Sequence, residues 1–259
     1  LAHSVNEASE KLKIQEQELK KKERARANWI SGVSHDIRTP LSMVMGYAAQ
    51  MEDDAELPDE ARKRAQMIRL QSVKMKNLVN DLNLASKLEY QMQPLHMERI
   101  SLAAVVRQTV AEFANLDFEE KYPICFEAKE GSGRGMIRGD KDLLCRAIGN
   151  ILTNSQVHNP DGCGIMVETD AGDGAFVIRL EDDGIGIGEE ELQKLQSTPH
   201  YMMSDGGLEE PRHGLGLLIV RQIVAAHGGT VLLDHGRQEE KGGFAVEMHF
   251  PIKENDDET

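Results

Sequence analysis

A histidine at position 35 stands in a run of residues whose types suit phosphoryl chemistry. The run is Ser34-His35-Asp36-Ile37-Arg38-Thr39-Pro40-Leu41-Ser42. An imidazole is a nucleophile that can accept a phosphoryl group, and Arg38 and Thr39 follow about one helical turn later. Because proline lacks an amide hydrogen and crowds the carbonyl of Asp36, a helix containing this run is expected to loosen or bend there. A solvated or core histidine is the alternative for His35 taken alone, and motifs further along the chain favour the chemical interpretation.

Two asparagines form a second candidate site in the segment NILTNSQVH, residues 150–158. Asn150 and Asn154 are four residues apart, so both amides lie on one face of a helix, and His158 extends that row. A side-chain amide oxygen is a suitable neutral ligand for Mg²⁺, which also keeps waters and the phosphate oxygens of a substrate. A polar helix edge explains the same pattern, and this segment alone does not decide between the two.

Two glycine-containing segments are further candidate binding sites. DDGIGI, residues 182–187, follows a strand pattern. There a carboxylate can accept a hydrogen bond from an exocyclic amine such as that of adenine, and glycines let the backbone approach a ligand closely. A glycine turn capped by Asp is the alternative. HGLGL, residues 213–217, opens an apolar helix whose first amides suit phosphate.

The stretch between these two segments, from Gln196 to Arg212, is expected to be a long loop able to close over a nucleotide. The chain has no Walker-type GK[ST] loop and no kinase-type glycine-rich strand followed by an HRD loop. If ATP binds, it therefore binds in neither of those ways.

The composition describes a globular protein with room for one large domain or two ordinary ones: 259 residues, 40% hydrophobic and 29% charged. A net charge of −14 argues against nucleic acid or an anionic membrane surface as the main partner. Cys125, Cys145 and Cys163 match no metal-ligand spacing, so we expect reduced thiols in a cytosolic compartment. No apolar window of 18 residues predicts a membrane span. The first residue is Leu1 rather than Met, which suggests a fragment of a longer chain.

Residues 1–24 are expected to form a signalling coiled-coil helix. Val5, Leu12 and Leu19 fall seven residues apart, which is a weak heptad, and a solvated helix is the alternative. The apolar pattern continues through the histidine run at Ile30, Val33, Ile37, Val44 and Met51. This pattern leaves His35 exposed, off the apolar stripe, and predicts that Ile37 is buried.

Residues 25–93 are predicted to form a helical hairpin. Leu57-Pro58-Asp59 interrupts the first helix, and Asp59 is expected to cap the second. The apolar positions of the second helix are Ala65, Ile68, Ser72, Met75, Val79 and Leu82. A hairpin of two long helices cannot bury both stripes alone, whereas two hairpins paired into a four-helix bundle can, so a homodimer is the natural state.

Residues 98–252 mix strand and helix patterns, which indicates an α+β sandwich. The expected helices are Leu102 to Phe118, Asp142–His158 and Leu215–Ala226. The expected strands are Ile124–Ala128, Ile165–Thr169, Phe176–Leu180, Thr230–Asp234 and Phe244–Ile252, with the second and third joined as an antiparallel hairpin by Ala171-Gly172-Asp173-Gly174. Residues 253–259 are an acidic tail.

With the four motifs assembled, residues 25–252 resemble the cytoplasmic catalytic part of a bacterial sensor histidine kinase of two-component signalling. SHDIRTPLS matches the H-box of that family, NILTNSQVH the N-box, DDGIGI the G1 box and HGLGL the G2 box. The resemblance implies a hairpin that forms a dimeric four-helix bundle, followed by an α/β sandwich ATPase domain of the histidine kinase/gyrase/Hsp90 type. It also implies the cytoplasmic portion of an inner- or plasma-membrane sensor, with membrane contact only through segments missing from this sequence.

The resemblance assigns roles within the histidine run. His35 is the phosphoacceptor, and Asp36 polarises or deprotonates its imidazole. Since neighbouring residues on a helix do not face each other, this pairing is expected to need a local distortion at Pro40. Arg38 helps to neutralise the incoming phosphate, and Thr39 orients water for dephosphorylation of the response regulator.

The resemblance also assigns the nucleotide site. Asn154 holds Mg²⁺ with Asn150 in support, and Asp182 reads the adenine amino group. The further nucleotide-site residues are His158, Gly184, Ile185, Gly186, Ile187, His213, Gly214, Leu215, Gly216 and Leu217. Val157 stands where the family often has Lys or Arg, and the aromatic F-box of the family is not recognisable.

The implied activity is ATP- and Mg²⁺-dependent autophosphorylation on His35. Transfer to an aspartate of a response regulator receiver domain follows, with phosphatase activity towards that regulator. A hinge near Met92–Leu95 would bring the histidine and ATP together. A degenerate nucleotide-binding dimeric scaffold without phosphotransfer is the alternative. An ATPase of the gyrase, Hsp90 and MutL group is a third, but its catalytic glutamate is replaced here by Asn150 and Asn154.

Overall fold

The computed structural model describes residues 2–115, 121–129, 131, 136–172, 174–197, 215–237 and 242–252. The chain divides into two compact units, Leu1–Gln93 and Pro94–Thr259. The expected acidic tail, the end of the first expected helix of the second unit at Phe118, most of the expected loop (residues 198–212), His213 and Gly214 lie outside the described residues.

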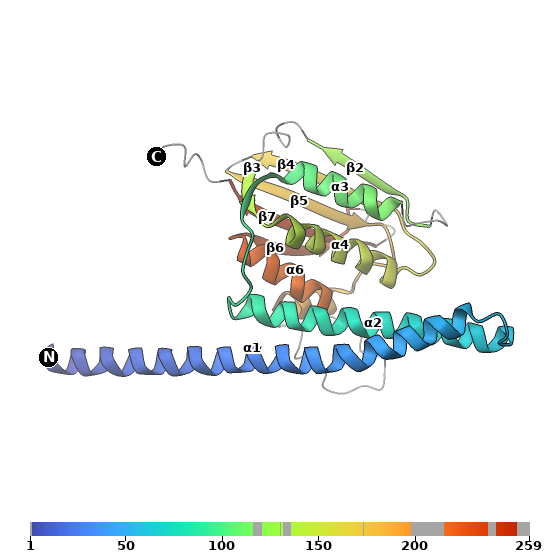
Figure 1. Cartoon of the computed structure of the whole chain (residues 1–259). Coiled ribbons are helices and arrows are strands. Elements are labelled where there is room, and N and C mark those ends of the chain that lie inside the picture. The colour runs from blue at the N-terminus through green and yellow to red at the C-terminus, as the bar shows by residue number, and fades with distance from the viewer. Residues whose placement is uncertain are drawn as a thin grey trace. The chain divides into compact units, whose positions relative to one another are not determined.

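The first unit is a hairpin of two long helices, α1 (Ala2–Asp53) and α2 (Asp59–Glu89) (Figure 1). The helix α1 runs through Pro40 without interruption, and Figure 1 shows it bent in its C-terminal half. A proline inside a helix is a common cause of such a bend. Asp59, predicted to cap α2, is instead its first helical residue and pairs with Arg62 at 2.5 Å.

Small side chains, together with Leu41, line the seam between the two helices. The buried residues of α1 recur every seven positions at Ala27, Ser34, Leu41 and Ala48, and those of α2 include Ala65 and Ser72. Within one hairpin Ile37 is not buried as predicted, because 43% of this residue remains exposed. The hairpin closes on the neighbouring row of small residues, which lets the helices approach closely, and leaves the larger apolar stripe uncovered.

The second unit is built on a five-stranded sheet in the order β2-β4-β5-β7-β6. The strands are β2 (Ile124–Ala128), β4 (Ile165–Gly172), β5 (Ala175–Asp182), β6 (Thr230–His235) and β7 (Phe244–Pro251). The antiparallel hairpin of β4 and β5 is confirmed, whereas β2 pairs with β4 in parallel. A separate two-stranded sheet, β1 (Glu98–Ser101) with β3 (Met136–Gly139), was not predicted.

Three helices, α3 (Leu102–Ala114), α4 (Lys141–His158) and α6 (Leu215–Ala226), cover one face of the five-stranded sheet (Figure 1). They enclose a core that includes Leu102, Leu144, Ile148, Phe176, Ile178, Leu180, Ile219, Met248 and Phe250. A further helix, α5 (Glu189–Ser197), was not predicted and takes in Gln196, where the loop had been expected to begin. Glutamates fill its first turn, where negative charge favours the helix.

Side-chain oxygens cap the two helices that open the second unit. Ser101 accepts a hydrogen bond from the amide of Ala104 at the start of α3, and Asp140 accepts one from Leu143 at the start of α4. Within the described part of the chain, none of the helices combines the length and apolar character needed to cross a bilayer.

Candidate functional site

His35 lies on the open side of α1, with 75% of its side chain exposed, as the apolar pattern predicted. Its Nδ1 lies 3.4 Å from Oδ1 of Asp36. A proton on Nδ1, directed at the carboxylate, leaves the lone pair on Nε2, which is then the nitrogen able to attack phosphorus. The helix α1 continues through Pro40, so His35 and Asp36 make this contact within an uninterrupted helix. The need for a local distortion at Pro40 stays a prediction.

The two polar residues that follow are engaged within the hairpin. Thr39 Oγ1 lies 3.5 Å from the carbonyl oxygen of His35. Arg38 donates from Nη2 to Oδ1 of Asn80 on α2 at 2.9 Å, so its guanidinium is directed to the second helix. The role of Arg38 at an incoming phosphate stays a prediction, and it requires exchange of Asn80 for phosphate oxygens.

An exposed row of side chains continues along α1 from the histidine. His35, Thr39, Met43 and Tyr47 are each four residues apart, so they follow one ridge of the helix. Met43 is 55% exposed and Tyr47 is 60% exposed. Met43 and Tyr47 were not predicted from the sequence, although their four-residue spacing from His35 was visible in it.

In the second unit, the two predicted asparagines of α4 both lie against the start of α6. Asn150 donates from Nδ2 to the carbonyl oxygen of Gly216 at 3.4 Å. A Cβ on Gly216 would lie 3.2 Å from Oδ1 of Asn154, so the glycine permits this approach. Both asparagines are half-buried, whereas His158 at the end of α4 is exposed. Leu215 is half-buried and Leu217 is buried in the same first turn of α6.

Asp182 is buried at the end of β5, and α4 holds its carboxylate. Ser155 donates from Oγ to Oδ2 of Asp182 at 2.8 Å, and Asn159 donates from Nδ2 to Oδ1 at 3.4 Å. The amide of Gly184 also donates to Oδ1 at 3.2 Å. A carboxylate offers about four lone-pair sites, so Asp182 is oriented by three donors and can still accept one from a ligand.

Sequence reasoning missed Ser155 and Asn159, which are both buried. Ser155 follows Asn154 directly, and Asn159 ends α4 just before Pro160. A polar residue next to each predicted ligand was therefore visible. The sequence did not show that both residues share one partner, Asp182, which lies 27 residues after Ser155 and 23 after Asn159.

The turn after Asp182 is made by glycines packed on backbone. Gly186 has φ +70°, and a Cβ there would lie 2.6 Å from the amide nitrogen of Gly243. Ile185 next to it is 75% exposed, and Ile187 is half-buried. The turn therefore presents backbone and one apolar side chain to a ligand, as a flat base such as adenine requires.

The donor set fits a magnesium ion that arrives with a nucleotide. Among the described residues, no group of three or more His, Cys, Asp or Glu could hold a metal ion. Mg²⁺ bound through phosphate oxygens and water needs only one or two protein ligands, and Asn154 supplies an amide oxygen of the right kind.

Cys163 lies beside this site but is not a nucleophile. Burial, and then the negative charges of Asp182 and Asp183, raise the pKa of its thiol to about 11. The thiolate is the reactive form, so Cys163 contributes packing near Ser155, whose carbonyl lies 3.8 Å from Sγ.

Two protein families match the chain. The family described as His Kinase A (phospho-acceptor) domain matches residues 25–91, and the family described as Histidine kinase-, DNA gyrase B-, and HSP90-like ATPase matches residues 139–254. The sensor histidine kinase YvrG of Bacillus subtilis is 29% identical over 230 residues, which are 88% of this chain and 39% of YvrG. The chain thus spans well under half the length of that relative.

Solved structures resemble the fold. The crystal structure of full-length ShkA in complex with AMPPNP has a TM-score of 0.69 at 23% identity, over 88% of this chain and 46% of ShkA. The histidine kinase ThkA in complex with the response regulator protein TrrA has a TM-score of 0.56 at 19% identity, over 86% of this chain and 60% of that chain. At these identities the likeness concerns the fold.

Proposed function

Since this chain belongs to the sensor histidine kinases of two-component systems, we propose that it transfers the terminal phosphoryl group of ATP to His35 and then to an aspartate of a response regulator. The observation that carries the proposal is the imidazole of His35, which is 75% exposed and has its Nδ1 next to Asp36. That imidazole and the nucleotide site that we propose in the second unit are the two parts that such a transfer needs.

We place the nucleotide in the second unit. Asp182, held by Ser155 and Asn159, accepts a hydrogen bond from the adenine amino group, and the glycine turn after it lies against the base. Asn154 is the protein ligand of Mg²⁺, and Asn150 fixes the start of α6 through Gly216. The predicted contacts of His158, His213 and Gly214 remain part of the proposal.

In the transfer, Nε2 of His35 attacks the γ-phosphorus as the bond to the bridging oxygen breaks and ADP leaves. Asp36 holds the proton on Nδ1 and stabilises the positive charge that develops on the ring. Mg²⁺, when bound, neutralises charge on the phosphate oxygens. Arg38 adds a cation at the histidine, and Thr39 orients the water that later dephosphorylates the regulator.

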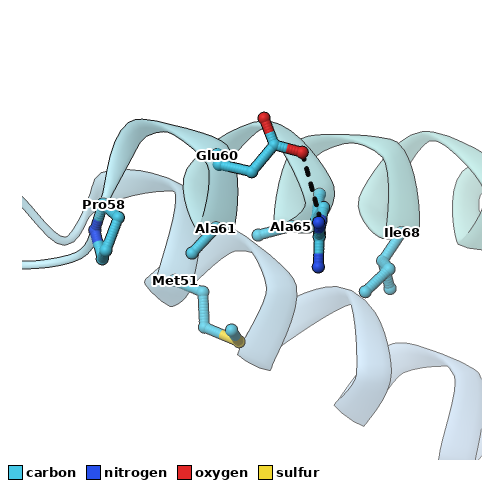
Figure 2. A pocket seen from close by; sticks show the side chains of 7 residues that line it. Met51, Pro58, Glu60, Ala61, Ala65 and Ile68 are labelled. Atoms are coloured by element: carbon cyan, nitrogen blue, oxygen red, sulfur yellow. Dashed lines mark hydrogen bonds and ion pairs between the residues drawn. The ribbon is translucent and has the colours of Figure 1, made fainter.

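We place two copies of the hairpin in a four-helix bundle. The apolar stripe left open on α1 consists of Val33, Ile37, Val44 and Met51, and that on α2 includes Ile68, Met75 and Leu82, all 37–48% exposed. At the closed end of the hairpin these stripes meet in a groove of about 440 Å³, where Met51 of α1 lies beside Ala61, Ala65 and Ile68 of α2 (Figure 2). A second hairpin laid on these stripes removes them from water.

The receiver domain of the regulator is placed on the exposed ridge of α1. Met43 and Tyr47 continue the row of His35 and Thr39, and large apolar and aromatic side chains are enriched in protein interfaces. We place the chain on the cytoplasmic side of a membrane, in a sensor protein like the sensor histidine kinase that it resembles.

The test is incubation of the chain with γ-labelled ATP and Mg²⁺. The label should be acid-labile and alkali-stable, as expected of a phosphohistidine, and His35→Gln should abolish it. His96→Gln is the matched control, because His96 is exposed and lies outside both proposed sites, and it should keep the label. Equal labelling of His35→Gln would refute the assignment, and ATP binding without any label would indicate a scaffold.

A further inference from the structure

The sheet face opposite the helices of the second unit carries a row of charged residues. Glu168 of β4, Arg179 of β5 and Glu247 of β7 are direct cross-strand neighbours. Arg179, with 10% of its side chain exposed, donates to Glu247 Oε1 at 2.7 Å and to Glu181 Oε2 at 2.8 Å. The row therefore has one arginine among three largely covered carboxylates.

Arg237 supplies the second cation of this row, from the connection between β6 and β7. Its Nη1 lies 2.7 Å from Glu168 Oε2 and its Nε lies 3.8 Å from Glu181 Oε2. Its backbone amide also donates to Glu181 Oε1. The side chains of Glu168 and Glu181 are only 10% and 13% exposed. Loss of Arg237 would therefore remove a cation that pairs with two largely buried carboxylates.

The same connection lies directly against the turn of the nucleotide site. A Cβ on Gly243 would lie 2.3 Å from the carbonyl oxygen of Asp182, and a Cβ on Gly242 would lie 3.1 Å from that of Ile185. The amide of Gly236 donates to the carbonyl oxygen of Gly243 at 3.1 Å, which closes the base of the connection. The backbone from Asp182 to Gly186 therefore rests on the base of the β6–β7 connection.

From these contacts we infer that Arg237 is a positioning residue of the nucleotide site. It ties the start of the β6–β7 connection to Glu168 and Glu181, and Gly242 and Gly243 at the end of that connection lie against the turn that follows Asp182. Glu181 is the residue before Asp182, so Arg237 is linked to this turn through Glu181 as well as through the base of the connection. The inference rests on the proposed function, because it assumes that an adenine nucleotide binds at Asp182.

The experiment compares Arg237→Gln with wild type in the full chain. Isothermal titration with AMPPNP and Mg²⁺ should show a dissociation constant raised by about five- to tenfold, the size expected for loss of a coupled partly buried pair. The KM for ATP in autophosphorylation should rise by the same factor, while kcat at saturating ATP stays within about twofold. Arg237→Lys should recover part of the affinity, because an ammonium can still pair with Glu168. Arg138→Gln, on an exposed residue of β3, is the matched control and should bind like wild type.

Glu168→Gln provides a second route, because it removes the ion pair and keeps the backbone bond of Arg237 to Glu181. It should also weaken AMPPNP binding, and its effect should not add fully to that of Arg237→Gln. The inference is overturned if both variants bind AMPPNP as wild type does, or if kcat falls with an unchanged KM. Failure of wild type itself to bind AMPPNP would overturn the proposed function as well, which separates the two results.

Discussion

The side chain of Asn159 occupies the space that a Cβ on Gly184 would need. That Cβ would lie 1.9 Å from Oδ1 of Asn159. The same oxygen accepts a hydrogen bond from the amide of Ile185 at 2.8 Å, and the Nδ2 of Asn159 reaches Asp182. One amide side chain thus determines the path of the turn and the orientation of the carboxylate that we assign to adenine.

Gly184→Ala should therefore damage the nucleotide site. The methyl group must displace Asn159 or the turn, and overpacking of this kind costs about 1–3 kcal/mol. We expect a strong loss of AMPPNP binding by titration calorimetry, with far-ultraviolet circular dichroism unchanged. Gly188→Ala is the control, because no atom lies within 4 Å of a Cβ at that position. Equal loss in both variants would show that the contact with Asn159 is not the cause.

Val157→Lys should strengthen ATP binding. Val157 is 68% exposed and lies three residues after Asn154 on α4, so a lysine there places a cation near the proposed phosphates. We expect a KM for ATP lower by about threefold or more, and a gain that shrinks as salt is added. Val157→Gln separates charge from length and should leave KM near the wild-type value. An unchanged KM for the lysine variant would place the phosphates away from this turn.

Met75→Lys should dissociate the proposed dimer. Met75 is 48% exposed on the stripe of α2 that we place in the bundle core, where an unpaired ammonium would lose its hydration. Sedimentation velocity should show a smaller particle. Met67→Lys is the matched control, because Met67 is 65% exposed but lies off that stripe, and it should remain dimeric. A dimer that survives both substitutions would require a different interface.

Arg179→Met should destabilise the second unit by about 2–4 kcal/mol at pH 7, since it leaves two largely covered glutamates without a shared cation. Burial acts to raise the pKa of Glu247, but hydrogen bonds from Arg179 and His249 outweigh it and hold that pKa below its usual range. This stabilisation is therefore present above the unfolded pKa of about 4.3, and it is lost as the pH falls through the lower folded pKa.

Urea unfolding of wild type and Arg179→Met at several pH values checks this prediction. The difference in unfolding free energy should be full near pH 7 and should narrow below about pH 4. Arg138→Met, at an exposed position, should differ little from wild type at any pH. A difference for Arg179→Met that is independent of pH would assign the effect to packing rather than to charge.

Local patterns predicted the long elements of this fold well. The alternation at Ile165–Thr169 and Phe176–Leu180 corresponds to β4 and β5, and Leu215–Ala226 corresponds to α6. Strand β1 was missed because it has four residues, of which only Ile100 is buried, and its partner β3 lies far along the chain. Short strands that depend on distant pairing leave little trace in local periodicity.

The sequence predicted which residues form the candidate site better than it predicted the contacts among them. Asn150, Asn154 and Asp182 were found from their spacing and surroundings, but the hydrogen bonds that orient Asp182 come from residues 23 and 27 positions earlier. The error at Ile37 has a related cause. Periodicity identified an apolar face of α1, but it could not distinguish the row covered by α2 from the row left for another chain.

Because α1 is continuous from Ala2 to Asp53, the direction in which each of its side chains points is fixed relative to all the others. Each helical residue turns about 100° and rises 1.5 Å, so one residue inserted upstream of His35 rotates everything before it by that angle relative to the imidazole. A rotation applied near Ala2 is therefore carried along about 50 Å of helix before it reaches His35. A signal applied at the start of this helix therefore reaches His35 through the rotational register of the helix as well as through its length.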